Sequence, residues 1–257
     1  MNIKPAIGII IILLVAAVAS TITLAAAPNI PIGPDSITTD YSTRKQVNTP
    51  VVIAAEAGNV TAMTIETSRQ TLGWAGYFGN ITGAIVLDDA NNYTFYSWAL
   101  EKPTGQVYAS NGTVTWDNVY CVNLSATGNP ETNYDRMNET TIEEFYGMNF
   151  SDHDGFSETF NQTYAGHFYV GDITISDQNV CPMAYMYVNQ AWQTNYFKEV
   201  LLTDNNSVIF TGLLEDSKQG YLPGADSTSD FQMLVAEDGH PFKESTLTDY
   251  YFYVEVQ

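Results

Sequence analysis

The feature that most restricts the fold of this chain is a series of short apolar runs that begins near residue 51. The runs are rich in β-branched and aromatic residues, which favour strands, and they end at Gly, Asn or Asp, which favour turns. The expected strands cover residues 51–53, 60–65, 84–87, 93–100, 106–109, 114–124, 167–175, 184–188, 196–202, 208–214, 231–235 and 250–256. The dipeptide Asn111-Gly112 is a signal for a hairpin turn. The pattern predicts an all-β domain, a β-sandwich or jelly-roll-like fold, over residues 51–257.

One short helix is expected inside a polar insertion at residues 126–163. The pairs Thr140-x-x-Glu143 and Thr141-x-x-Glu144 have the spacing of a capping box, and Gly147 follows as a stop signal. One domain and two subdomains both fit a chain of this length, and we treat residues 51–257 as one domain.

The first 27 residues have the layout of a signal peptide or a membrane anchor. Lys4 precedes a hydrophobic helix that begins at Ala6, and the segment closes with small residues before Pro28. Cleavage after Ala19 or Ala27 fits this pattern. An uncut helix over residues 6–27 also fits, because about 33 Å of helix is enough to cross a bilayer. Both alternatives place the rest of the chain outside the cytoplasm, and the absence of a cysteine in this segment excludes a lipoprotein.

The N-terminal segment also resembles a known family. Ala6-Ile7-Gly8-Ile9, together with residues 15–19, resembles the hydrophobic assembly helix of archaeal flagellins and type IV pilin-like proteins. Those families have Lys-Gly or Arg-Gly at the cleavage point before the helix, whereas this chain has Lys4-Pro5. The rest of the chain resembles, in its Asn, Thr and Tyr content, archaeal cell-surface glycoproteins. The resemblance implies a surface filament or coat subunit.

Acceptor sequences for N-linked glycans are the most specific signal in the chain. Nine Asn-x-Ser/Thr sequons occur, where about three are expected by chance. Their asparagines are Asn59, Asn80, Asn92, Asn111, Asn123, Asn138, Asn149, Asn161 and Asn205. Because a glycan is bulky and hydrophilic, each of these residues is expected on the surface of an extracellular glycoprotein.

The chain is strongly acidic. It contains nine Lys and Arg residues and twenty-nine Asp and Glu residues, which gives a formal net charge of −20. This charge repels nucleic acid and anionic membrane surfaces. It suits bound cations, a salty medium or simple solubility.

The two cysteines, Cys121 and Cys181, are expected to form a disulfide, because cysteines in exported proteins usually pair. Two separate buried thiols are the alternative. A bridge would close a loop that contributes about 4 kcal/mol in the chain-entropy model. The spacing fits neither a zinc site nor a CxxC redox motif.

Residues 28–50 are expected to be an extended arm between the N-terminal segment and the domain. The arm contains Pro28, Pro31, Pro34 and Pro50 and has few large apolar residues. It is either a spacer or a segment that adds as a strand to a neighbouring subunit.

Two groups of residues are candidates for ligand binding. Four aspartates, Asp88, Asp89, Asp152 and Asp154, lie in short acidic segments and could hold calcium as a cofactor; without an ion these segments are acidic turns. Trp74 and Tyr77 lie in a Gly-punctuated aromatic segment, which is either a platform for carbohydrate or a partner, or a core strand. His153, between two aspartates, could bind a metal or act as a base, but loop histidines are commonly only solvated.

The motifs of common hydrolases and nucleotide-binding enzymes, HExxH, GxSxG, SxxK and the P-loop, are absent from the sequence. We therefore expect a non-enzymatic extracellular or cell-surface protein, a filament, pilus or coat subunit or an adhesin. Its copies would associate by strand addition through residues 28–65 or the C-terminal strand. The alternatives are a glycan- or solute-binding module and, less favoured, a secreted hydrolase with paired carboxylates. No nucleic-acid partner is expected, and membrane contact would be through an uncleaved N-terminal helix.

Overall fold

The computed structural model describes residues 30–40, 42–45, 49–50, 52–68, 70–124, 138–149, 151–176, 180–221, 228–237 and 247–257. Strands account for 38% of it and helices for 6%, so the prediction of an all-β protein is confirmed. The expected signal peptide or anchor at residues 1–27 lies outside the described residues. Within these ranges no helix has the length and apolar character needed to cross a membrane.

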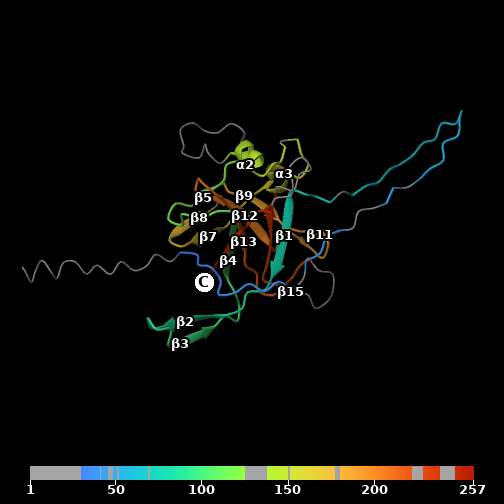
Figure 1. Cartoon of the computed structure of the whole chain (residues 1–257). Helices are drawn as coiled ribbons and strands as arrows, with labels where there is room; N and C mark the ends of the chain where they lie inside the picture. The colour runs from blue at the N-terminus through green and yellow to red at the C-terminus, as the bar shows by residue number, and fades with distance from the viewer. Residues whose placement is uncertain are drawn as a thin grey trace, which may run out of the picture.

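A seven-stranded antiparallel sheet forms the centre of the molecule (Figure 1). Its strands are β4 (Gly105–Ser110), β5 (Tyr120–Cys121), β6 (Gln162–Thr163), β9 (Pro182–Tyr185), β12 (Lys198–Thr203), β13 (Val208–Leu213) and β17 (Tyr251–Val256). The order across the sheet is β17-β4-β13-β12-β9-β6, and β5 pairs with β12 beside β9. Strands β4, β12 and β13 are buried almost throughout, because other parts of the chain cover both faces of the sheet.

Alternate residues along the central strands supply two separate cores. Leu201 and Phe210 point to one face, which we call the helix face, and belong to one buried cluster. Leu202 and Ile209 point to the opposite face, which we call the disulfide face, and belong to a second cluster. All four side chains are fully buried, so each face stabilises the fold through apolar burial.

The helix face is covered by a two-stranded sheet and two helices. The sheet pairs β1 (Trp74–Gly79) with β16 (Phe231–Ala236), and the helices are α2 (Glu139–Phe145) and α3 (Phe156–Thr159). Trp74, Phe156 and Phe210 meet at the centre of this face, with the ring centroids of Trp74 and Phe156 5.0 Å apart. Tilted and edge-on aromatic pairs of this kind add to the stabilisation that burial alone provides.

The disulfide face is covered by the hairpin of β7 (His167–Val170) and β8 (Ile173–Ser176). Glu255 on β17 accepts hydrogen bonds from the hydroxyl of Tyr108 on β4, at 3.0 Å, and from the backbone N–H of Gly171 in the β7–β8 turn. The last strand therefore joins the central sheet to the hairpin that covers it.

A hairpin and a long loop project away from this body (Figure 1). The hairpin consists of β2 (Ala84–Asp88) and β3 (Thr94–Ala99), and all of its strand residues are exposed. The loop, residues 52–68, runs outward to a turn at Gly58 and back, and it contains no strand. Two small pairs lie nearer the body, β10 (Tyr187–Val188) with β11 (Ala191–Trp192), and β14 (Lys218–Gln219) with β15 (Thr228–Ser229).

Several strand predictions need correction. Within the described residues, the segments expected at 51–53 and 60–65 form no strand, because no other segment pairs with them. The strand expected at 114–124 reduces to β5. The strand expected at 167–175 is two strands, since the chain reverses at Gly171, whose φ of +56° is readily adopted by glycine.

The predicted helix exists, but its cap is not the expected capping box. Helix α2 begins after Asn138, whose Oδ1 accepts hydrogen bonds from the N–H and hydroxyl of Thr141. Glu143 turns toward the interior and accepts from the N–H of Phe156 instead of returning to the start of the helix. The helix ends before Gly147, as predicted, and this glycine has a φ of +64°.

Candidate functional site

The two aromatic candidates lie on β1, but they do not form a common binding platform. The ring of Trp74 packs into the helix face, and its Nε1–H donates to the backbone oxygen of Asp154 at 2.6 Å. Tyr77 has 42% of its surface exposed, and its ring packs edge-on against that of Phe252. Of the two interpretations, the arrangement of Trp74 therefore matches a core strand.

The four aspartate candidates are divided between two distant turns. Asp88 and Asp89 lie at the tip of the β2–β3 hairpin, where the N–H groups of Tyr93 and Asn91 hold the pKa of Asp89 below its usual value. Asp152 and Asp154 lie in the loop before α3. Asp152 accepts from the N–H of Asn149 at 2.8 Å, and Asp154 accepts from the hydroxyl of Thr71. Three of these four carboxylates therefore already act as acceptors within turns or between segments.

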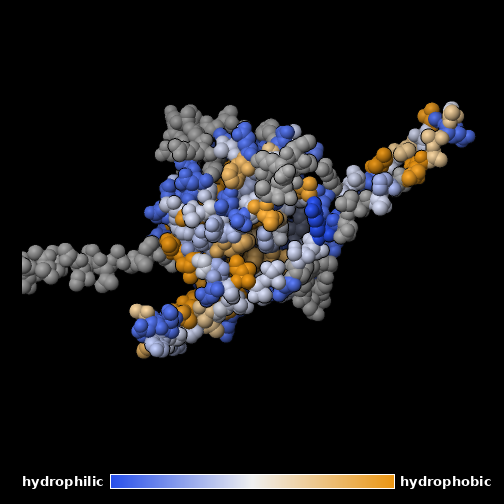
Figure 2. All heavy atoms as spheres, in the orientation of Figure 1, coloured by the Kyte–Doolittle hydropathy of each residue, from blue (hydrophilic) through white to orange (hydrophobic). Residues whose placement is uncertain are grey.

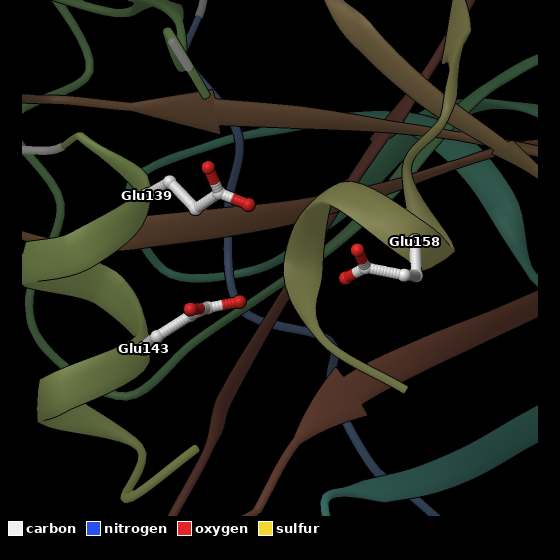
Figure 3. Close-up of side chains that lie close together, drawn as sticks. All are labelled: Glu139, Glu143 and Glu158. Atoms are coloured by element: carbon white, nitrogen blue, oxygen red, sulfur yellow. The ribbon is translucent and has the colours of Figure 1, made fainter. Parts of the chain in front are cut away.

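A different acidic group is brought together by the fold. Glu139 and Glu143 on α2 point toward Glu158 on α3, and one oxygen from each lies within 4.8 Å of the others (Figure 3). The sequence analysis missed this group. The spacing of Glu139 and Glu143, four residues apart, places them on one helix face and was a usable signal for two of the three.

Glu139 and Glu143 are deeply buried, with 4% and 2% of their surfaces exposed. Burial raises the pKa of Glu143, and the charges of Glu139, Glu158 and Asp152 raise it further, against the lowering effect of the Phe156 N–H. One oxygen of Glu143, Oε2, is buried without a hydrogen-bond partner. The group therefore brings three carboxyl groups together, two of them where water has little access.

The structure joins Cys121 and Cys181 in a disulfide, as the sequence predicts. Their Cα atoms are 4.8 Å apart, and the bridge connects β5 to the residue that precedes β9 on the disulfide face. A buried structural disulfide is typical of proteins that mature in an oxidising compartment.

The nine sequon asparagines all reach the surface to some degree. Asn111, Asn138 and Asn205 are half-buried, and the others are exposed: Asn59, Asn80, Asn92, Asn123, Asn149 and Asn161. Asn59 and Asn92 lie beside the turns at the tips of the projecting loop and of the β2–β3 hairpin. No sequon asparagine occupies a core position, so the positions are compatible with the glycosylation that the sequence predicts.

The projecting loop carries apolar side chains into solvent (Figure 2). Val60 is fully exposed and Val52 is exposed to 92%, and the same loop carries Ile53, Met63 and Ile65, all more than half exposed. Near its base, Nζ of Lys45 donates to the hydroxyl of Ser68 at 2.6 Å. The loop has the composition of a strand, but no segment in the described part of the chain pairs with it.

The β2–β3 hairpin exposes a continuous apolar face. Ile85 pairs with Trp98 and Leu87 pairs with Tyr96, so these four side chains share one side of the hairpin. Each of these residues has between 45% and 55% of its surface exposed. The ring centroids of Tyr96 and Trp98 are 4.6 Å apart. Because an isolated two-stranded hairpin is at best marginally stable in water, this face is suited to a covering partner.

Strand β17 forms one edge of the central sheet. In the described part of the chain its outer side is paired through a single bridge, in which Val254 exchanges backbone hydrogen bonds with Ile32 at 2.8 and 3.2 Å. No other described segment pairs with this outer side of the six-residue strand.

Comparison with known proteins gives no relative: no family model, no curated protein and no solved structure matches this chain.

Proposed function

We propose that this protein is an extracellular, glycosylated structural subunit, of a surface filament, pilus or coat, whose copies join by strand addition. The observation that carries the proposal is the projecting loop, residues 52–68, which presents strand-forming apolar residues that pair with no other described segment of the chain. In strand addition, an extended segment pairs with the open edge of a neighbouring sheet, and its alternate side chains occupy the surface there.

The acceptor in this proposal is the outer edge of β17 in a second copy. This edge already pairs with Ile32 of its own chain in one antiparallel bridge, so its backbone groups are oriented for further pairing. Pairing would bury apolar side chains of the loop, among them Met63 and Ile65, that are exposed in the single chain. The face of the β2–β3 hairpin would be a second contact between copies.

Other features fit a protein that works outside the cell. The disulfide fits an oxidising environment, the acidic surface favours solubility, and the sequons beside the loop turn and the hairpin turn would place glycans at the ends of these projections, away from their sides. The resemblance of the N-terminal segment to the assembly helix of archaeal flagellins and pilin-like proteins points in the same direction.

The first test is immunogold electron microscopy of the cells that make the protein, followed by two loop variants. Met63→Asp with Ile65→Asp should remove ordered fibres or layers, because paired strands cannot readily bury two carboxylates. The melting temperature of the isolated subunit should stay unchanged, since both side chains are more than half exposed.

Ala62→Asp with Thr64→Asp is the matched control, because it adds the same charge to exposed positions of the same loop that alternate with Met63 and Ile65. The control should still assemble. Dispersed gold without any ordered structure, or equal loss of assembly in both variants, would contradict pairing through the loop.

A second candidate function is recognition of glycans by the β2–β3 hairpin, which the exposed, adjacent rings of Tyr96 and Trp98 favour. Trp98→Ala should then abolish binding on a glycan array, whereas Phe95→Ala, on the opposite side of β3, should not. The absence of binding by the native protein would exclude this candidate.

We also infer that the fold belongs to the sandwich type. The β1–β16 pair lies against β12 and β13 of the central sheet, which gives two facing layers with an apolar core between them. A crystal structure in which these layers separate would refute this assignment.

A further inference from the structure

The three glutamates described above come from two helices that meet over the helix face. Glu139 and Glu143 occupy successive turns of α2, and Glu158 extends from α3 toward them (Figure 3). The mutual distance of at most 4.8 Å between their oxygens brings three acidic groups into one small volume. Ionised carboxylates this close repel one another unless a cation or protons compensate.

A separate observation indicates that a ligand belongs between them. Glu143 is 98% buried, and only its Oε1 has a partner, the N–H of Phe156 at 3.2 Å. Its Oε2 is buried with no hydrogen-bond partner at all. Buried polar atoms are normally satisfied, and an oxygen of a buried carboxylate that belongs to an acidic cluster can be satisfied by a cation.

We propose that Glu139, Glu143 and Glu158 bind one calcium ion that ties α2 to α3. Calcium takes oxygen ligands at about 2.3–2.6 Å, so oxygens on opposite sides of the ion are about 4.6–5.2 Å apart. The oxygens of the three carboxylates are at most 4.8 Å apart, which does not exceed the span across one calcium ion. Magnesium requires shorter, octahedral contacts and retains several waters, for which two buried ligands leave little room.

The backbone next to the site is shaped around these carboxylates. A Cβ atom at Gly155 would lie 2.6 Å from Oε1 of Glu143 and 2.6 Å from an oxygen of Glu158, so glycine allows both carboxylates to close over the chain. The neighbouring Asp154 holds the indole of Trp74 through its backbone oxygen. An ion here would therefore fix both helices and the start of β1 over the aromatic core.

This inference does not depend on the proposed function, because the site lies within a single chain. The test uses the full chain freed of metal with a chelator and then titrated with calcium chloride, followed by calorimetry and thermal unfolding. We expect saturable binding of one ion and, at calcium about a hundredfold above its dissociation constant, a rise in melting temperature of about 5–10 °C.

Glu143→Gln and Glu158→Gln should each abolish this rise. Glutamine at 143 keeps an acceptor for the N–H of Phe156, and Glu158 is exposed, so at least the second variant should fold normally. Glu144→Gln, on the exposed side of the same helix, removes the same charge and should retain the full calcium response.

Three results would overturn the proposal. One is a melting temperature that does not respond to calcium from 10 µM to 10 mM, a range chosen to include the about 10⁻⁴–10⁻³ M affinities of extracellular calcium sites. The second is an equal response in the Glu158→Gln variant and the native chain, which would place the ion elsewhere, for example at Asp88 and Asp89. The third is stronger stabilisation by magnesium than by calcium.

Discussion

Glu199 is a fully buried acid in the middle of β12, on the helix face. Its Oε2 accepts a hydrogen bond from the N–H of Leu234 at 2.8 Å, and its Oε1 has no partner. Burial raises the pKa of this carboxyl well above its usual value, and the single N–H bond offsets only part of that effect. The Glu199 carboxyl therefore keeps its proton up to a higher pH in the folded chain than in the unfolded chain.

The raised pKa of Glu199 predicts a direction for stability against pH. A group with a raised folded pKa contributes stability that is fully present below its unfolded pKa and is lost as pH rises through the folded pKa. Glu199→Gln should remove this loss of stability. At neutral pH the unfolding free energy of the variant should therefore be about 1–3 kcal/mol higher than that of the native protein, the usual cost of an unsatisfied buried polar group.

Urea denaturation of both proteins at pH 4 and pH 7 measures the effect of Glu199→Gln. The difference in unfolding free energy should be larger at pH 7 than at pH 4. A difference that does not change with pH would show that Glu199 is charged in the folded protein. Glu144→Gln, at an exposed position, is the control for a general effect of removing one acid.

At the scale of elements, the residue that caps helix α2 is also the asparagine of a predicted glycosylation sequon. Asn138 supplies the side-chain oxygen that accepts from Thr141 at 2.9 Å, and Asn138-Glu139-Thr140 is a sequon. Asn138→Ala should lower the unfolding free energy by about 1 kcal/mol through loss of the cap. Chemical denaturation of protein made without glycans measures this change.

Two further variants separate the cap from the glycan. Asn138→Asp keeps an acceptor for Thr141 and removes the glycan site, so the unglycosylated protein should retain nearly native stability. Thr140→Ala removes the sequon and leaves the cap in place. Equal stability of the Asn138→Ala and native proteins would show that α2 needs no side-chain cap.

The β2–β3 hairpin should be the least protected paired element of the isolated subunit. Its strands are exposed on both sides, whereas β4 and β13 are buried, so its hydrogen bonds can open without disturbing the core. Amide hydrogen exchange over residues 84–99 should be faster by orders of magnitude than over residues 105–110. If copies cover the hairpin, assembled material should show slower exchange there, and slow exchange in the isolated subunit would contradict the openness of this element.

At the scale of the whole molecule, the sequence predicts the strands that the core holds in place. Residues 106–109, 208–214 and 250–256 match β4, β13 and β17, because burial and strand propensity agree at these positions. Residues 60–65 have the same composition but pair with none of the segments that the structure describes, because strand pairing is not a local property. Propensity alone therefore overestimates strand content in projecting segments.

The candidate site also combines features that the sequence predicts with features that it does not. The disulfide and the positions of the sequons follow from single residues and short motifs, which the sequence contains directly. The cluster of three glutamates could not be predicted in full, because Glu158 reaches Glu143 only through the packing of α3 against α2. Contacts between neighbouring elements of irregular length leave no periodic signal in the sequence.

The folded structure should also control which sequons can be modified after folding. Ser207 of the Asn205 sequon is buried, with 7% of its surface exposed, whereas the threonines that follow Asn59 and Asn92 are exposed. Folded, unglycosylated protein incubated with an oligosaccharyltransferase should gain glycans at Asn59 and Asn92 and not at Asn205. Mass spectrometry of glycopeptides measures occupancy, and modification of Asn205 under these conditions would show that the β12–β13 turn opens readily.

The pairing of β17 with β4 also affects the time at which the domain can form. Tyr108 and Glu255, which bond across these strands, are 147 positions apart. At usual synthesis rates of about 5–20 residues per second, β17 is made about 7–30 s after its partner β4. During that interval the central sheet lacks an edge, and Asn111, Asn123 and Asn205 are carried by a chain that has not yet closed around them. The last strand of the sheet is therefore made several seconds after these sequons, and during that period an enzyme could modify them before the domain folds.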